Sequence, residues 1–217
     1  MDSLLFLLYT IIYFVSLIII VINIKKSPVL SLLFLLPVVI GLLYDNAVIT
    51  LGRFLGESNL NEQLNLLRFL LHAIFTPFLT FYAWAVVKKT NISLTRSLVF
   101  RIAPYVITAI LIIIELYNEV ISLQIAPKWE YGVLTYSSVG SSGPPLMVII
   151  VAIILLIASI IVLVKQKWVW FFIGSLVMII MNAVKIPVNS GALTNLSEVI
   201  LIASLLATSL FQARKHY

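Results

Sequence analysis

Asp45, Arg68 and His72 can all take part in acid–base or ionic chemistry, and they lie in one stretch that runs from Tyr44 to Pro77. Arg68 and His72 are four residues apart, so in a helix they share one face. A carboxylate that holds an imidazole can orient the ring and stabilise its protonated form, as general acid–base catalysis requires. The sequence therefore makes Asp45 and His72 candidate catalytic residues and Arg68 a candidate ligand-binding residue.

The chain around these residues is too apolar for a soluble protein. Of its 217 residues, 62% are hydrophobic and 10% are charged, whereas soluble domains carry about 25% charged residues. The composition therefore predicts an integral membrane protein, which we assign to the cell membrane. The net charge of +6 comes from basic residues that flank apolar segments in ones and twos. This pattern is typical of membrane topology signals, and we expect no nucleic-acid partner.

Seven apolar segments are each long enough, or nearly so, to cross a bilayer. Backbone groups in lipid need partners within their own segment, so the sequence predicts an all-α fold in a single polytopic domain. The predicted helices cover residues 3–23, 29–52, 64–87, 98–118, 145–164, 168–187 and 194–212.

The positions of the basic residues predict the orientation of the seven helices. Alternate connections and the C-terminal tail hold ten lysines and arginines, and the opposite connections and their helix ends hold four. The positive-inside rule then places the N-terminus outside the cell and the C-terminus in the cytoplasm.

Helix rise gives the depth of the polar residues. At about 1.5 Å per residue, Asp45 and His72 both lie about 12 Å below the outer surface, and Arg68 lies about 6 Å below it. Charges inside a membrane are costly and generally face a water-filled cavity or an ion-pair partner. We expect a cavity that opens outward, with Asp45 paired to Arg68 or His72, and Lys185 paired to Glu198. Further candidate ligand-binding residues are Asn46, Arg53, Glu115, Asn182, Lys185, Asn195 and Glu198.

Structural roles for several of these residues stay open. Arg53 and Lys185 can extend to the lipid headgroups, and Glu115 can be an ordinary helix-end charge. Asp45 and His72 can also be a purely structural pair. Pro77 is expected to kink the third helix just below His72 and widen the cavity.

Residues 119–144 form the only long connection, and it is predicted to lie outside. Its glycines and serines allow a flexible tether, whereas Trp129, Tyr131 and Tyr136 allow a lid over an outward-facing site. The repeated tripeptide at Asn46–Val48 and Asn182–Val184 fits a parallel internal repeat of some small transporters, but chance is the better explanation of so short a match.

The motifs in the sequence leave three candidate functions. The chain has no cysteine, and its single intramembrane histidine does not favour a zinc site, so we expect no metal or cofactor. It also has no phosphate-binding loop and no nucleophile elbow. The candidates are a membrane-embedded enzyme acting on a lipid or isoprenoid, a small and possibly proton-coupled transporter, and a sensor or binding protein. The ligand would be amphipathic or anionic, and the oligomeric state is left open.

Overall fold

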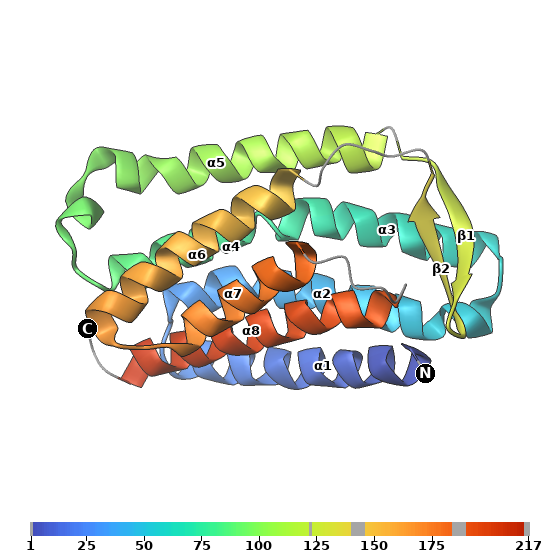
Figure 1. Ribbon diagram of the computed structural model, residues 1–217, viewed down its shortest axis with the longest axis horizontal. Helices are drawn as coiled ribbons and strands as arrows, with labels where there is room; N and C mark the ends of the chain where they lie inside the picture. The colour runs from blue at the N-terminus through green and yellow to red at the C-terminus, as the bar shows by residue number, and fades with distance from the viewer. Residues whose placement is uncertain (1, 122, 140–145, 184–189, 215–217) are drawn as a thin grey trace.

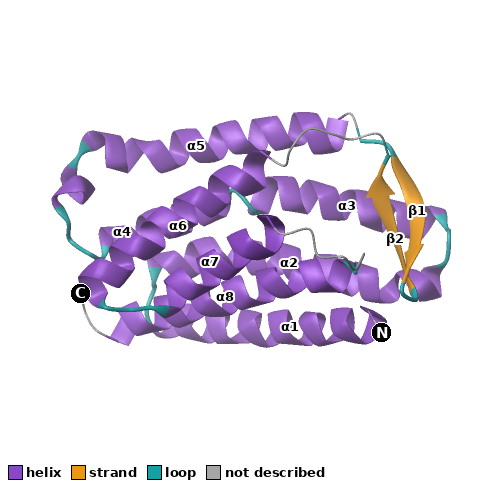
Figure 2. Cartoon of the chain, in the orientation of Figure 1, coloured by secondary structure: helices purple, strands orange, loops and turns teal. Residues whose placement is uncertain are grey.

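The computed structural model describes residues 2–121, 123–139, 146–183 and 190–214, and it shows a bundle of roughly aligned helices with a short hairpin across one end (Figures 1 and 2). The α-helices of the described residues are α1 (Asp2–Lys26), α2 (Leu30–Leu55), α3 (Asn59–Phe75), α4 (Phe78–Lys88), α5 (Leu98–Leu116), α6 (Leu146–Gln166), α7 (Trp170–Ala183) and α8 (Gly191–Arg214). A 3-10 turn (Ser93–Arg96) precedes α5, and a π-helical turn (Tyr117–Ile121) follows it.

Among the described residues, six spans are long and apolar enough to cross a membrane, if α3 and α4 are taken together as one span, Asn59–Lys88. Their apolar composition supports a membrane protein. The seventh predicted span, at 168–187, is described only as the 14 residues of α7. A spanning helix needs about 20 residues. The predicted number of seven spans therefore stays a prediction.

The third predicted span is longer than expected and is broken in the middle. Its helix begins at Asn59 because Ser58 caps it: the Ser58 hydroxyl accepts a hydrogen bond from the Asn61 backbone N–H. The break lies at Thr76 and Pro77, between α3 and α4. Proline lacks the backbone N–H that a continuous helix would use and clashes with the preceding turn, which explains the break below His72.

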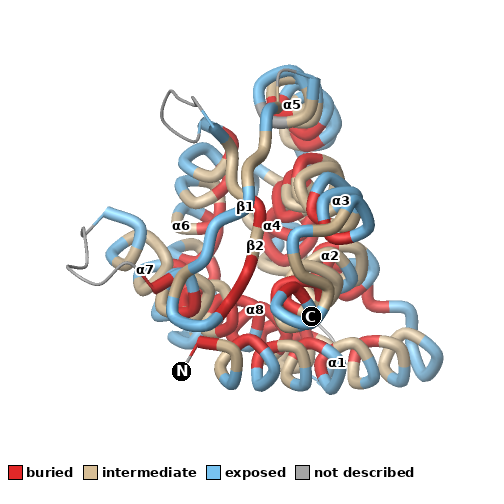
Figure 3. The backbone as a smooth tube through the Cα atoms, turned by 90° about the vertical axis from the view of Figure 1, so that its right-hand side faces the viewer, coloured by how far each residue is buried: buried red, intermediate tan, exposed pale blue. Residues whose placement is uncertain are grey.

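Helix α8 lies inside the bundle against α7, α1 and α2, and α5 lies at the edge of the bundle (Figure 3). Half of the most apolar window of α8 is buried, compared with 22% in α5. Helices α7 and α8 approach closely at Gly174, where an added Cβ would lie 2.0 Å from the Ser204 hydroxyl oxygen. Small residues at such a crossing let two backbones pack tightly in a membrane.

An antiparallel hairpin occupies part of the long connection, a feature that the all-α prediction omits. Strands β1 (Ile125–Glu130) and β2 (Val133–Ser138) pair with Trp129 opposite Leu134. The turn at Tyr131 and Gly132 has positive φ at both residues, as tight hairpin turns prefer. The hairpin crosses the end of the bundle from α5 towards α1 (Figure 1). Its turn is held there because the Ser3 hydroxyl donates to the Gly132 carbonyl at 2.9 Å.

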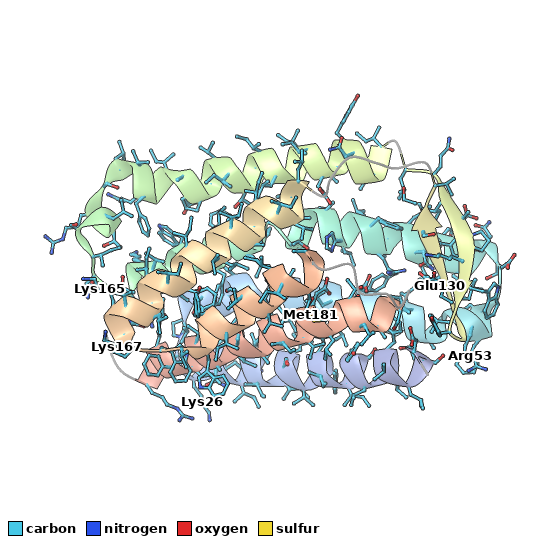
Figure 4. All side chains as sticks on the ribbon, in the orientation of Figure 1. Lys26, Arg53, Glu130, Lys165, Lys167 and Met181 are labelled. Atoms are coloured by element: carbon cyan, nitrogen blue, oxygen red, sulfur yellow. The ribbon has the colours of Figure 1, made fainter. Side chains whose placement is uncertain are left out.

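The two ends of the bundle carry different sets of charged side chains. Lys26, Lys165 and Lys167 lie at one end, which we call the basic end, whereas Arg53 and Glu130 lie at the other, the hairpin end (Figure 4). This separation agrees with the alternation of basic connections in the sequence. The side of the membrane that each end faces stays a prediction.

Candidate functional site

Asp45 and Arg68 form an ion pair between α2 and α3, one of the two pairings that the sequence predicts for Asp45. The Arg68 Nε donates to an Asp45 carboxylate oxygen at 2.7 Å. Both side chains are largely buried, with 14% of the Arg68 side chain and 24% of the Asp45 side chain exposed. Burial reduces screening by water, so each charge depends on the other for its stability.

Arg68 also connects this ion pair to the hairpin. Its Nη1 donates to the side-chain oxygen of Asn65 and, at 2.8 Å, to the hydroxyl of Thr135 on β2. The same Asn65 oxygen accepts from the Tyr136 backbone N–H at 3.3 Å. Most of the guanidinium donors are therefore used within the protein. That Arg68 holds a ligand headgroup stays a prediction, and its described contacts are with Asp45 on α2, Asn65 on α3 and Thr135 on the hairpin.

A second asparagine continues this network towards the end of α2. Asn65 donates to the side-chain oxygen of Asn61 at 3.0 Å, and Asn61 donates to the carbonyls of Gly52 and Gly56. Both asparagines are buried. Gly52 also lies against the hairpin, because a Cβ there would be 2.0 Å from the Leu134 carbonyl oxygen. The hairpin is thus fitted to α2 and α3 through both polar contacts and close packing.

His72 lines a cavity of about 210 Å³, which we call the chamber. Side chains from α2, α3, α4, α6, α7 and α8 and from the α3–α4 junction form its wall. Its polar residues are His72, Thr76, Asn182 and Glu198, and its apolar residues are Val38, Leu42, Leu79, Val148, Val151, Ala152, Leu155, Met178, Leu201 and Ile202. Two ionisable groups from different helices, α3 and α8, therefore face one otherwise apolar space.

The predicted hydrogen bond between Asp45 and His72 is absent among the described residues. The Asp45 carboxylate accepts from Arg68, whereas the His72 Nδ1 contacts the Thr76 hydroxyl oxygen at 3.3 Å. His72 and Asp45 nevertheless line the same small recess beside the chamber. Asp45 therefore influences the imidazole through its charge, and Thr76 is the residue that orients the ring.

A second cavity, of about 280 Å³, lies between the hairpin and the bundle, and we call it the vestibule. Arg68 and Asn195 contribute from α3 and α8, and β1 contributes Lys128 and Glu130. Lys128 and Glu130 form an ion pair of 2.8 Å. The vestibule is more polar than the chamber, since hydroxyls from β2 also line it: Thr135, Ser137 and Ser138.

The remaining predicted residues are only partly brought together. Asn46 is fully buried and accepts from Asn195 at 3.4 Å, which joins α2 to α8. Asn182 lines the chamber, although its amide donates to the Met178 carbonyl of its own helix. Arg53 is exposed and lies over the ring of Phe54.

Glu115 and Lys185 do not join the site in the described structure. Glu115 is buried near the end of α5 and lines neither the chamber nor the vestibule. Lys185 lies outside the described residues, and so does its predicted pairing with Glu198. The Glu198 carboxylate makes no hydrogen bond within the described part of the chain, and its side chain lines the chamber.

Sequence reasoning missed a buried polar network in the half of the bundle nearest the basic end. The Ser31 hydroxyl donates to Ser209, and the Tyr82 hydroxyl donates to the Leu205 carbonyl at 2.7 Å. Nearer the end, Gln212 donates to the side chain of Gln166 at 2.9 Å. These residues are uncharged, so a search for ionisable groups overlooked them. Their spacing on α8 was the available signal, since Ser209 and Gln212 are three residues apart and share one face of the helix.

Tyr13 was also overlooked, and it lies close to the ionisable residues of the site. Its ring is fully buried in α1, and its hydroxyl has no hydrogen-bond partner among the described residues. The phenol is near enough to Glu198 and Asp45 to interact with them electrostatically.

Within the described ranges no three histidine, cysteine, aspartate or glutamate side chains gather closely enough to hold a metal ion. A comparison of the chain with protein-family models, curated proteins and solved structures finds no match. Any functional conclusion therefore comes from the geometry of the chamber and the vestibule.

Proposed function

We propose that this protein is a membrane-embedded enzyme that binds a lipid- or isoprenoid-type amphipathic substrate in the chamber and acts on it by acid–base chemistry. The observation that carries the proposal is the composition of the chamber wall. His72 and Glu198 face a space whose other sides are mostly apolar. Ligand pockets commonly have this character: a largely apolar lining with a few polar groups that fix orientation.

The size of the chamber limits the apolar part of the substrate. An apolar cavity of about 150 Å³ holds one benzene ring, and the chamber measures about 210 Å³. A single acyl or isoprenoid chain segment fits such a volume, whereas the two chains of a bilayer phospholipid do not. The proposed substrate is therefore a single-chain amphiphile.

The contacts of His72 define its proposed role. When the imidazole Nδ1–H donates to the Thr76 hydroxyl, Nε2 keeps its lone pair and can accept a proton from the substrate. The negative charge of Asp45, across the small recess, stabilises the imidazolium that forms. Glu198 faces the same space from α8 and serves as the second acid–base group.

Buried side chains bound the chamber towards the basic end, which supports an enzyme over a transporter. One turn beyond the lining of the chamber, α8 carries Leu205, which is fully buried, whereas Ala83 and Ala158 also line a separate apolar cavity of about 200 Å³. Near Leu205, the hydroxyls of Tyr82, Ser209 and Ser31 tie α4, α8 and α2 together. A passage through this end would have to break those contacts.

Turnover of defined single-chain lipids tests the proposal. Purified protein in nanodiscs would be incubated with fatty-acyl esters and prenyl alcohols, and the products would be identified by mass spectrometry. We expect His72→Gln and Glu198→Gln to lower turnover about 100-fold or more. Glu62→Gln, a change at an exposed acid on α3, is the control and should leave turnover unchanged. Wild-type rates in both chamber variants would rule out acid–base catalysis at this site.

A transporter is the second candidate, and one observation favours it. The buried polar groups near the basic end supply part of the polar track that transport needs, although the layer at Leu205 separates them from the chamber. Transport of a lipid or of protons across proteoliposomes, abolished by Glu198→Gln, would replace the enzyme proposal with this one.

A further inference from the structure

The vestibule and the chamber follow one another along the same two helices. On α3, Arg68 lines the vestibule and His72, four residues on, lines the chamber. On α8, Asn195 lines the vestibule and Glu198, three residues on, lines the chamber. Three or four residues of helix correspond to about 5–6 Å. One extended amphiphile can therefore place its headgroup in the vestibule and its chain in the chamber.

The charges of the vestibule argue against an anionic headgroup. Its cations in the described structure are Arg68 and Lys128, and each already has a carboxylate partner: Asp45 for Arg68 and Glu130 for Lys128. Asp2 adds a further acid, buried and hydrogen-bonded to the Ser190 hydroxyl at 2.8 Å. An anion would meet no unpaired cation among the described residues and would lie near the carboxylates of Asp2 and Glu130, which disfavours its binding.

The polar groups that remain available are uncharged. Ser137 and Ser138 on β2 make no side-chain hydrogen bond within the described part of the chain, and both line the vestibule. Asn195 contributes an amide oxygen as well as its amide nitrogen. A hydroxyl donates and accepts equally well, so these groups match a ligand that carries hydroxyls.

We propose that the vestibule binds an uncharged, hydroxyl-bearing headgroup, of the glycerol or sugar type, joined to the single chain that occupies the chamber. This inference rests on the proposed function only in that the chamber holds the chain. The headgroup meets the protein under the hairpin, and the bond that joins headgroup and chain then lies near His72 and Glu198.

Binding of three probes with the same acyl or alkyl chain tests the inference without any turnover. The probes are a monoacylglycerol, the corresponding monoacylglycerol phosphate and an alkyltrimethylammonium salt. Affinities would be measured by calorimetry on protein held in amphipol, because sugar detergents carry the proposed headgroup and would compete. We expect the monoacylglycerol to bind at least about tenfold more tightly than either charged probe.

A matched pair of variants tests the reason for this preference. Glu130→Gln releases Lys128 from its partner and should shift the affinity ratio towards the phosphate probe by about threefold or more. Glu57→Gln removes an acid whose partner is Trp129 on the hairpin and which does not line the vestibule, so the ratio should not change. An equal shift in both variants would overturn the charge argument.

The outcomes for wild-type protein separate the two proposals. Tightest binding by the phosphate or the ammonium probe would overturn the headgroup assignment and leave the chamber as a chain site. Failure of all three probes to bind would overturn both the headgroup assignment and the proposed function. Tightest binding by the monoacylglycerol supports the headgroup assignment even if His72→Gln leaves turnover unchanged.

Discussion

Arg68 links the ion pair of the site to the hairpin that covers it. Its guanidinium contacts Asp45 on α2, Asn65 on α3 and Thr135 on β2. Such a side chain has few donors left for a ligand. Its main contribution is then to hold three elements together, and the loss of one partner leaves a charge in a mostly apolar environment.

The Asp45–Arg68 pair is predicted to be a major source of stability. Asp45→Asn should lower the free energy of unfolding by about 3 kcal/mol, because it leaves the guanidinium of Arg68 without its counter-charge. The measurement is thermal or denaturant unfolding in detergent, with Arg68→Gln and the double variant completing a cycle. Lys128→Gln breaks the more exposed pair with Glu130 and should cost less than about 1 kcal/mol. Equal costs in the two pairs would contradict this account.

The orientation of His72 by Thr76 gives a second prediction. Thr76→Val keeps the side-chain shape and removes the hydroxyl that contacts Nδ1, so turnover should fall about tenfold or more while the melting temperature changes little. The matched control is Thr10→Val, since the Thr10 hydroxyl donates only to the Phe6 carbonyl of its own helix. Unchanged turnover in Thr76→Val would show that the hydroxyl does not position the imidazole.

Depth along a helix predicted the Asp45–Arg68 pair because both residues lie in long, regular segments. The same reasoning could not supply Thr135, which approaches Arg68 from a hairpin far along the chain. The same reasoning predicted that Asp45 is the catalytic partner of His72. In the structure, Arg68 donates to the Asp45 carboxylate, and Thr76 contacts the imidazole of His72. Which neighbouring side chain each of these residues contacts depends on side-chain geometry, which the spacing along the sequence does not specify.

At the scale of elements, the hairpin gives the long connection a definite form. Leu134 and Tyr136 on β2 are buried against the bundle, and Trp129 on β1 donates to Glu57 at 3.1 Å. Of the two readings of this connection, tether or lid, the described residues 123–139 favour the lid. Tyr136 is the buried aromatic residue of the lid, while Trp129 and Tyr131 stay exposed.

Gly52 offers a direct test of how the hairpin is seated. Gly52→Ala would place a Cβ 2.0 Å from the Leu134 carbonyl oxygen, so the hairpin must shift away from α2. We expect faster hydrogen exchange at residues 125–138 and a loss of about 1–3 kcal/mol in the free energy of unfolding. Gly191→Ala is the control, because its Cβ would meet only the Phe6 ring, at an ordinary 3.7 Å. Unaltered exchange in Gly52→Ala would contradict this packing.

The positions of the helices and the break at Pro77 followed from hydropathy and from proline chemistry. The hairpin was missed because the long connection was interpreted only as a flexible tether or a lid, and no strands were predicted in it. A local signal existed at 131–138, where Tyr131 and Gly132 precede a run rich in β-formers, Val133–Tyr136. The described part of α7 ends at Ala183, and the rest of the predicted span 168–187 lies outside the described residues.

At the scale of the molecule, the two ends of the bundle differ in charge and in form. One end carries the basic connections, and the other carries the hairpin and the vestibule. The sequence-based topology would put the hairpin end outside the cell. The vestibule and chamber would then be reached from the outer leaflet or from outside the cell.

Cysteine labelling tests this orientation, and the chain has no cysteine of its own. Asn59→Cys lies at the hairpin end and Ser93→Cys near the basic end, and both positions are exposed. A thiol reagent that cannot cross membranes should label Asn59→Cys on intact cells, and Ser93→Cys only after the cells are opened. The reverse pattern would place the hairpin end in the cytoplasm.

Photo-crosslinking tests most directly the central claim, that the chamber holds the chain of a single-chain amphiphile. A monoacylglycerol with a diazirine in its acyl chain would be irradiated with the protein in nanodiscs, and the crosslinked residues would be identified by mass spectrometry. Helix α6 provides the contrast, because Val151 and Leu155 face the chamber whereas Ile153 and Ile160 are exposed on the outside of the bundle. We predict crosslinks at Val151 and Leu155 that an excess of unlabelled monoacylglycerol removes. Crosslinks confined to Ile153 and Ile160 would show that the lipid only surrounds the protein, and would contradict the account.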